Sequence, residues 1–237
     1  MKVTREKLYI DAGSYAFDWD RPRSHGCHVM QVIEMMAVKL GMEEPPPTGM
    51  PEEALQWYRF GGFVNEYVMA HHLTQIEASR NPLALFIPGE FMWCYECDMV
   101  IYPSMGQYGE RIGDEHCKTR NHHGICGTPD AMSLRDYSLE EWKCTWKTSN
   151  RAGGDNDKDS GREHISTGMW RWPQQTMAYA YAMETEKATL KAMWVNGDYK
   201  PPRPSGDKFS FTFTRSELES VWSSLVGYAK RYNLLGV

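Results

Sequence analysis

The sequence predicts a mixed α/β fold in which a central mixed β-sheet is flanked by helices. Two observations lead to this class: a series of β-forming segments fills the middle of the chain, and helical patterns lie before and after it. The 237 residues suffice for one domain with a substantial core. Hydrophobic residues make up 41% of the chain and charged residues 24%, which is typical of a globular protein.

The helical segments are predicted from spacing and end signals. Apolar residues recur at helical spacing over 27–40, and Gly41 can end that helix. A second helix is expected to begin at Pro51, with the Gly61–Gly62 pair able to kink it. Further helices are expected from Pro173 to about Thr185 and, after a capping box at Thr214–Glu217, to about Tyr232.

Three or four strands are expected between the second and third helices, and two more before the last helix. The β-rich run Phe91–Tyr102 is followed by two short strands from Gly124 and another from Ser138 to Trp146. Segment 188–195 and a strand that places Phe209, Phe211 and Phe213 on one face complete the set. The polar, Gly-rich segment 151–163 is expected to form a flexible flap.

The organisation along the chain indicates a single domain. Residues 1–50 are interpreted as an N-terminal helical extension, whose first 26 residues have weak periodicity, and residues 51–237 as the core. No apolar run approaches the roughly 18 residues of a membrane span, and the N-terminus lacks the apolar segment of a signal peptide. A cytoplasmic protein is expected, with its six Cys as free thiols or metal ligands.

The formal net charge of −5 argues against a general polyanion binder. It does not exclude an enzyme that acts on a polyanion with the help of a bound metal ion, because the ion supplies positive charge.

The residues most suited to chemistry are Asp130 and the triplet Glu141–Trp142–Lys143. On a strand, residues two apart project to the same face, so Glu141 and Lys143 point together while Trp142 points away. A hairpin between the flanking strands would place Asp130 beside Glu141. Two adjacent carboxylates repel each other unless a cation lies between them, and Mg²⁺ prefers such oxygen ligands. Lys143 could then orient water or stabilise charge on a phosphate, although a solvated strand face would carry the same short pattern.

These residues resemble the signature of the PD-(D/E)XK nuclease superfamily. The match consists of Gly127–Asp130 followed by Glu141–Lys143, and two flanking pieces resemble the RecB and lambda-exonuclease branch. These pieces are Gly62 with Glu66 upstream and Gln175 with Tyr179 downstream. The resemblance covers about half the chain, and its four pieces occur in the family's order.

The resemblance implies a restriction-endonuclease-like core and a role for each matched residue. Asp130, Glu141 and the main-chain carbonyl of Trp142 would hold Mg²⁺ or Mn²⁺, and Glu66 would complete the acidic cluster. Lys143 would activate water or stabilise the transition state. Gln175 and Tyr179 would steady the active-site strand and contact the DNA backbone, although buried packing explains Tyr179 equally well.

The resemblance further implies a phage-type exonuclease that acts on duplex DNA ends in recombination or DNA processing. The polar run Thr145–Thr148 is similar to that of phage members, and the chain has no P-loop motif of a helicase motor. A single-strand annealing protein and a second copy of the chain are possible partners under this reading. Polarity, strand preference, the number of metal ions and the choice between exonuclease and endonuclease stay open.

Four alternatives to this interpretation are open. A zinc site could use Cys94, Cys97, Cys117 and the His122–His123 pair, but the β-rich context of the first two disfavours a zinc knuckle. Asn121–Gly124 has a weak likeness to an HNH nuclease, and an iron–sulfur nuclease lacks its C-terminal Cys cluster. A DNA-binding or assembly protein without turnover would retain the fold, but it has no need of the intact Asp130, Glu141 and Lys143 set.

Overall fold

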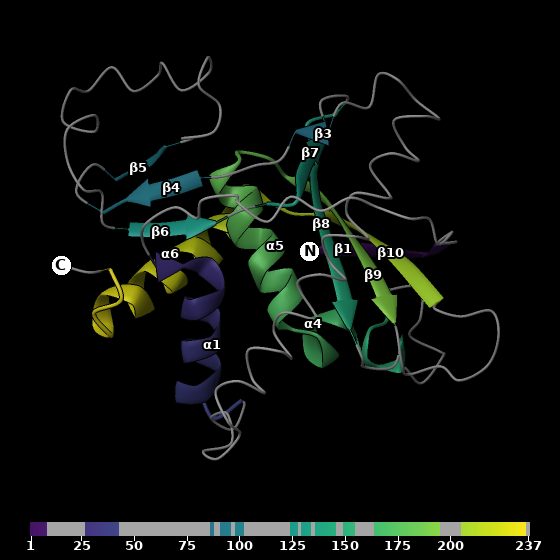
Figure 1. The fold of residues 1–237 in the computed structure, drawn as a ribbon, viewed down its shortest axis with the longest axis horizontal. Helices are drawn as coiled ribbons and strands as arrows, with labels where there is room; N and C mark the ends of the chain where they lie inside the picture. Colours follow the sequence, from purple (N-terminus) through teal and green to yellow (C-terminus); the bar gives the residue numbers. More distant parts are fainter. Residues whose placement is uncertain are drawn as a thin grey trace, which may run out of the picture.

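The computed structural model describes residues 1–8, 27–42, 86–87, 91–95, 98–101, 124–127, 129–133, 136–145, 149–154, 164–194 and 205–235. Two β-sheets and a group of helices fill the described part of the chain (Figure 1). The predicted mixed α/β class, with a mixed sheet flanked by helices, is confirmed. The helix expected over 51–75 and most of the flap at 151–163 lie outside the described residues.

The larger sheet carries the strand that holds Glu141 and Lys143. All neighbouring strands in it are antiparallel except β8 and β9, which are parallel and connected by a helical crossover, as parallel neighbours require. Its order is β1 (Lys2–Leu8), β10 (Ser205–Thr212), β9 (Lys187–Trp194), β8 (Leu139–Thr145), β7 (Ala131–Ser133) and β3 (Phe86–Ile87).

The smaller sheet corrects one prediction. The β-rich run Phe91–Tyr102 does not form one strand but a hairpin, whose chain reversal includes Asp98 at φ 51°. The turn follows Cys94 directly, so the β-rich context used against a zinc knuckle ends at this residue, and Cys97 lies outside the described residues. The order is β2 (Cys27–His28), β6 (Gly124–Gly127), β4 (Phe91–Cys94) and β5 (Met99–Ile101), with β2 and β6 parallel.

The helices begin and end near the expected residues. Gly41 adopts φ 66° just past the first helix, and the capping box of Thr214 and Glu217 is present at the start of the last. The third predicted helix begins at Arg171, which leaves Pro173 in its first turn, where its missing N–H costs nothing. The bounds are α1 (Val29–Lys39), α4 (Ile165–Gly168), α5 (Arg171–Ala182) and α6 (Arg215–Arg231), with a 3₁₀ turn, η2, at Ser149–Arg151.

Helix α5 lies at the centre of the molecule. It packs against β8 and β9 on one side and against α1 and α6 on the other (Figure 1). Ala178, Tyr179 and Ala180 on this helix are fully buried, as are Leu190 and Phe209 in the sheet beneath it. None of the described helices combines the length and the apolar character that a membrane span needs.

The first eight residues hold a strand that the weak periodicity of this segment did not predict. Strand β1 pairs along its whole length with β10, from Lys2 opposite Thr212 to Leu8 opposite Gly206. Part of the expected N-terminal extension therefore belongs to the larger sheet.

Candidate functional site

Strands β7 and β8 bring Asp130 next to the Glu141–Lys143 triplet, as the hairpin interpretation predicted. Ala131 lies opposite Glu140 in the antiparallel register, so the next position along the chain sets Asp130 against Glu141. Asp130 also lies where the chain passes from the smaller sheet, after Gly127, to the larger sheet at Ala131. The junction between the two sheets therefore carries the first carboxylate.

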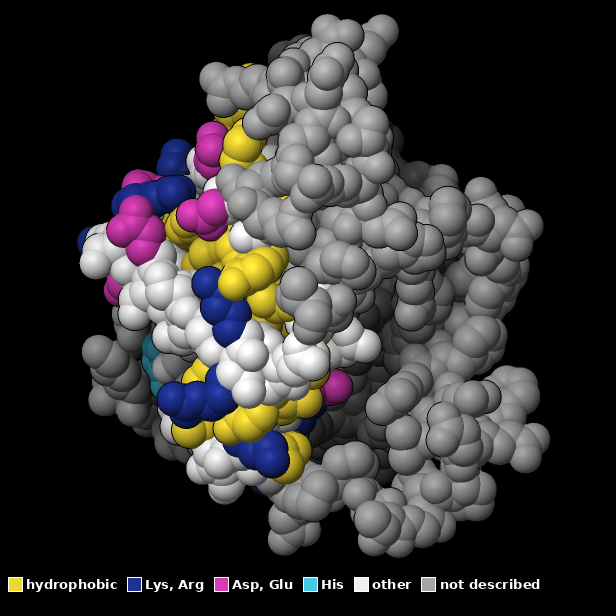
Figure 2. Space-filling model, turned by 90° about the vertical axis from the view of Figure 1, so that its left-hand side faces the viewer, with side chains coloured by type: hydrophobic (Ala, Val, Ile, Leu, Met, Phe, Trp, Pro, Cys, Tyr) yellow, Lys and Arg dark blue, Asp and Glu magenta, His cyan; other side chains and the backbone are white. Residues whose placement is uncertain are grey.

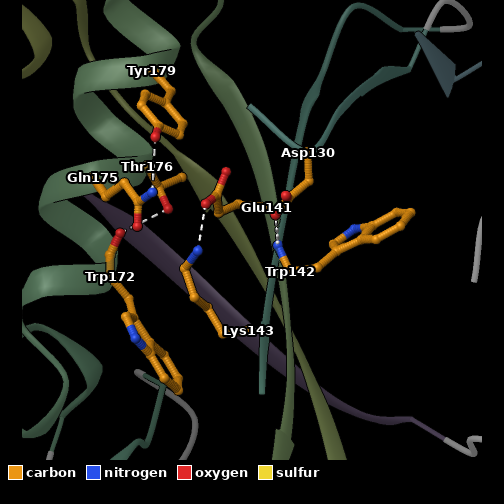
Figure 3. Close-up of polar contacts among 8 residues, drawn as sticks. All are labelled: Asp130, Glu141, Trp142, Lys143, Trp172, Gln175, Thr176 and Tyr179. Atoms are coloured by element: carbon orange, nitrogen blue, oxygen red, sulfur yellow. Dashed lines mark hydrogen bonds and ion pairs between the residues drawn. The ribbon is translucent and has the colours of Figure 1, made fainter. Parts of the chain in front are cut away.

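A backbone hydrogen bond fixes this carboxylate to β8. The main-chain N–H of Trp142 donates to Asp130 Oδ2 at 2.7 Å. In a β-strand the N–H and C=O of one residue point to the same side, so the carbonyl of Trp142 also points to the side on which Asp130 lies. The carboxylate and this carbonyl are thus on the same edge of β8, and Figure 3 shows the hydrogen bond from the Trp142 nitrogen to Asp130.

Glu141 and Lys143 project together from β8 toward helix α5, while the Trp142 side chain points away from it (Figure 3). Lys143 Nζ donates to Glu141 Oε1 at 2.6 Å. Both side chains are buried, with exposed fractions of 1% for Glu141 and 9% for Lys143. A buried ion pair at this place, beside a second carboxylate, is not the solvated strand face that would explain the pattern without chemistry.

Helix α5 supplies the two polar residues above this pair. Gln175 Nε2 donates to Tyr179 Oη at 2.9 Å, and both side chains are buried. The buried Gln175 Oε1 accepts no hydrogen bond from any residue that the structure describes. Because a buried amide oxygen without a donor is costly, a hydrogen bond donated to this atom would lower that cost.

Gly127 makes room for the Tyr179 ring. A Cβ atom on Gly127 would lie 2.5 Å from Tyr179 Cε1 and 2.7 Å from the Phe91 ring. Phe91 and Tyr179 meet edge to face at a centroid distance of 5.6 Å. The glycine that precedes Pro129–Asp130 is therefore needed for the packing of the helix over the site.

Electrostatic interactions connect the four side chains. Removal from water raises the pKa of Asp130, and the Lys143 ammonium and the Trp142 N–H partly oppose this rise. Burial also raises the pKa of Tyr179, and the nearby Glu141 carboxylate raises it further, so Tyr179 is a neutral donor and acceptor. Asp130 is thus a carboxylate whose charge is poorly stabilised by the protein itself.

Sequence reasoning missed a second buried pair on the opposite face of β8. Glu140 Oε2 accepts from Lys191 Nζ at 2.9 Å and from Trp142 Nε1 at 3.0 Å, and Lys191 Nζ lies 5.4 Å from the centre of the Trp142 ring. Lys191 is 1% exposed. The one signal in the sequence is that neighbouring residues on a strand point to opposite faces, so Glu140 must lie on the face opposite to Glu141.

The donor set at the site suits a hard cation. Two carboxylates and a main-chain carbonyl are oxygen ligands of the kind that Mg²⁺ takes, and burial raises the pKa of Asp130 despite the nearby Lys143 ammonium. Within the described residues no three His, Cys, Asp or Glu side chains converge on one point. Glu66, the third predicted acid, lies outside the described residues, as do Cys97, Cys117 and the histidines of the zinc reading.

Comparisons with known proteins give weak likenesses. No protein-family model matches the chain. A 45-residue segment, 19% of the chain, is 42% identical to histone deacetylase 6 of Caenorhabditis elegans and covers only 4% of that protein.

Two solved structures are similar at low sequence identity. A phage-related exonuclease from Haemophilus somnus 129PT is 12% identical, with 86% of this chain and 79% of that chain covered and a TM-score of 0.38. The protein SSO0001 is 11% identical, with 88% and 79% covered and a TM-score of 0.36. Likenesses at this level do not establish a function.

Proposed function

We propose that this protein is a metal-dependent deoxyribonuclease of the PD-(D/E)XK kind, with Asp130, Glu141 and Lys143 in its active site. The observation that carries the proposal is the meeting of Asp130 with the buried Glu141–Lys143 pair at one edge of β8. A carboxylate pair with an amine beside it is the set of groups that phosphodiester hydrolysis needs.

Asp130, Glu141 and the Trp142 carbonyl would hold Mg²⁺ or Mn²⁺, and Glu66 would add a further carboxylate. The ion would supply positive charge against the phosphate and lower the pKa of a water molecule. The fit rests on the chemistry of the donors and on the raised pKa of Asp130, whose charge an ion would balance.

Lys143 is a hydrogen-bond donor that Glu141 already orients. Its ammonium, paired at 2.6 Å with the carboxylate, can donate to a phosphate oxygen and stabilise the negative charge that develops there. In this arrangement we assign to Lys143 the stabilisation of charge rather than the removal of a proton from water. Glu141 then has two tasks, since it orients Lys143 and contributes to the cation site.

Gln175 and Tyr179 would position the strand and contact the substrate. The buried Gln175 Oε1 accepts no hydrogen bond within the described residues, while the nitrogen of the same amide donates to Tyr179. We infer that a phosphate-bound water or a sugar hydroxyl donates to it when DNA enters. The DNA of a phage-type exonuclease would be a duplex end, and a single-strand annealing protein would be the natural companion of that activity.

Digestion of an end-labelled linear duplex and of its closed-circular counterpart tests the proposal, in Mg²⁺, in Mn²⁺ and in EDTA. We expect loss of the linear substrate in either metal and no loss in EDTA. Glu141→Gln should abolish the loss, because it removes a ligand and the partner of Lys143. Lys143→Met should lower the rate by about 10²–10³-fold, which is typical for the loss of one group that stabilises the transition state.

The variants need a control for folding. Glu219→Gln, at an exposed position on α6, makes the same chemical change away from the site and should digest DNA at the wild-type rate. Cutting of the circle as well would make the enzyme an endonuclease of the same fold. Absence of cleavage by the wild type in both metals would refute the nuclease and favour a DNA-binding protein without turnover.

A further inference from the structure

A patch of basic and aromatic side chains lies outside the candidate site, on the side of the molecule where α1, α6 and the β4–β5 hairpin meet (Figure 1). Its cations are exposed and its rings are partly exposed. The helix-end patch consists of Lys39, Tyr95, Tyr228, Lys230, Arg231 and Tyr232.

Contacts between the rings and the cations hold the patch in order. Lys230 Nζ lies 4.8 Å from the centre of the Tyr95 ring, and Lys39 Nζ lies 5.4 Å from the centre of the Tyr232 ring. Tyr228 and Tyr232 stack at 5.9 Å. Ammonium groups held over ring faces lose less conformational freedom on binding than freely moving lysines, so this surface is prepared for an anion.

The C-terminal part of α6 carries a charge opposite to that of the whole chain. The segment from Ser220 to Leu235 contains Lys230 and Arg231 and no acidic residue, whereas the chain carries a net charge of −5. Figure 2, which looks onto this side, shows Lys and Arg side chains among hydrophobic ones, with most of the acidic side chains in view at one margin. Asp98, three residues after Tyr95, accepts a hydrogen bond from Trp93 Nε1 at 3.1 Å, and Glu96, which follows Tyr95 directly, lies outside the described residues.

Strand β4 connects the patch with the candidate site. Phe91 at its start packs against Tyr179 at a centroid distance of 5.6 Å, and Tyr95, just past its end, lies under Lys230. Four residues of extended chain span about 13 Å. The patch therefore begins one short strand away from the residue that packs against Tyr179.

We propose that the helix-end patch binds the phosphate backbone of the nucleic acid whose end lies in the candidate site. The proposal rests on the proposed function for the identity of the polyanion and adds a second contact region to it. The cations make the contact, and the tyrosines orient them. Because ammonium groups lie over the Tyr95 and Tyr232 rings, the patch recognises phosphates rather than individual bases.

Binding without cleavage tests this proposal. A fluorescein-labelled 30-nucleotide single strand and the matching duplex are titrated in EDTA at several salt concentrations with the wild type and with Lys39→Ala/Lys230→Ala/Arg231→Ala. If the three cations each neutralise one phosphate, the slope of log Kd against log salt falls by about 2 for the single strand and by nearly 3 for the duplex. Lys2→Ala is the control, since Lys2 is exposed on β1 and pairs with Thr212 just before α6 begins.

The control lies far from the patch, because the 17 residues of α6 separate its two ends by about 25 Å. Equal slopes for the triple variant and the wild type would overturn the patch proposal and leave the nuclease proposal standing. If the wild type cleaves DNA but its DNA binding does not depend on salt, the patch proposal is likewise overturned and the nuclease proposal stands. Loss of binding by Lys2→Ala to the same extent would also overturn it, because the effect would then be one of total charge. Failure of the wild type both to bind and to cleave DNA would refute both proposals.

Discussion

Asp130 is the most informative single residue, because its burial disfavours the charged form of its carboxyl group. Burial raises its pKa, and the opposing effects of Lys143 and of the Trp142 N–H do not cancel this rise. A group whose pKa is higher in the folded than in the unfolded chain favours folding below its ordinary value of 3.8, and that advantage is lost as the pH rises through the folded value. At neutral pH the ionised Asp130 therefore lowers the stability of the metal-free protein.

Asp130→Asn should consequently raise the free energy of unfolding at pH 7 in EDTA, by about 0.5–2 kcal/mol, while it abolishes cleavage. Asn retains an oxygen that can accept from the Trp142 N–H, so the hydrogen bond is preserved. Urea unfolding at pH 4 and pH 7 measures the effect, and the gain should be smaller at pH 4. Added Mg²⁺ should stabilise the wild type and not the variant.

Asp136 provides a control of opposite sign. Burial acts to raise its pKa, but hydrogen bonds from Ser133 and Ser138 outweigh this, so the folded pKa is lowered. Its contribution to stability is present above 3.8 and lost as the pH falls through the lower folded value. Asp136→Asn should therefore destabilise the protein at pH 7. A loss of stability for Asp130→Asn as well would contradict the view that Asp130 is a poorly compensated charge.

At the scale of elements, the sequence predicted the parts of the fold that depend on local patterns. The capping box of Thr214 and Glu217, the glycine at position 41 and the alternating phenylalanines of β10 are all present. The hairpin at 91–101 was missed, because composition shows β-forming residues but does not show where the chain reverses. Asp98 at φ 51° makes that reversal without the glycine that would have marked it.

Gly127 connects two elements in a way that its sequence context did not reveal. The sequence identified it only as the first residue of the motif that leads to Asp130, whereas the structure shows the Tyr179 ring of α5 packed where a Cβ of this residue would lie. The contacts of β6 with Tyr179 of α5 and with Phe91 of β4 explain why a side chain is excluded there. The position of Tyr179, and through it that of Gln175, therefore depends on a residue of the smaller sheet, although Glu141 and Lys143 belong to the larger one.

Gly127→Ala should destabilise the protein by about 1–3 kcal/mol, because the added methyl group would lie 2.5 Å from Tyr179 Cε1 and 2.7 Å from Phe91, in a packed core. The near-UV circular dichroism of the aromatic rings should change, and the cleavage rate should fall more than DNA binding. Gly227→Ala is the matched control, since nothing lies within 4 Å of a Cβ there, and it should not destabilise α6. Unchanged stability for Gly127→Ala would mean that α5 moves freely on the smaller sheet.

At the scale of the whole molecule, the pairing of the two ends of the chain could not be predicted. Arg5 in β1 and Asp207 in β10 are 202 residues apart, yet their side chains form a buried ion pair at 2.5 Å. Local patterns carry no information about which strands become neighbours, so neither the sheet order nor this pair followed from the sequence. The candidate site was predictable for the opposite reason, since Asp130 and Glu141 belong to consecutive strands of one hairpin.

The Arg5–Asp207 pair gives the last prediction. Arg5→Met should lower the free energy of unfolding by about 3–5 kcal/mol, because it leaves a fully buried carboxylate without its counter-charge. The double variant Arg5→Met/Asp207→Asn should recover most of this loss. In the wild type Trp194 Nε1 donates to Asp207 Oδ2 at 2.7 Å, and the amide oxygen of Asn can accept the same hydrogen bond. Urea unfolding of the two single variants and the double variant measures the coupling. A cost below 1 kcal/mol for Arg5→Met would show that β1 is held by its backbone ladder with β10 alone, and that the larger sheet closes without help from the pair.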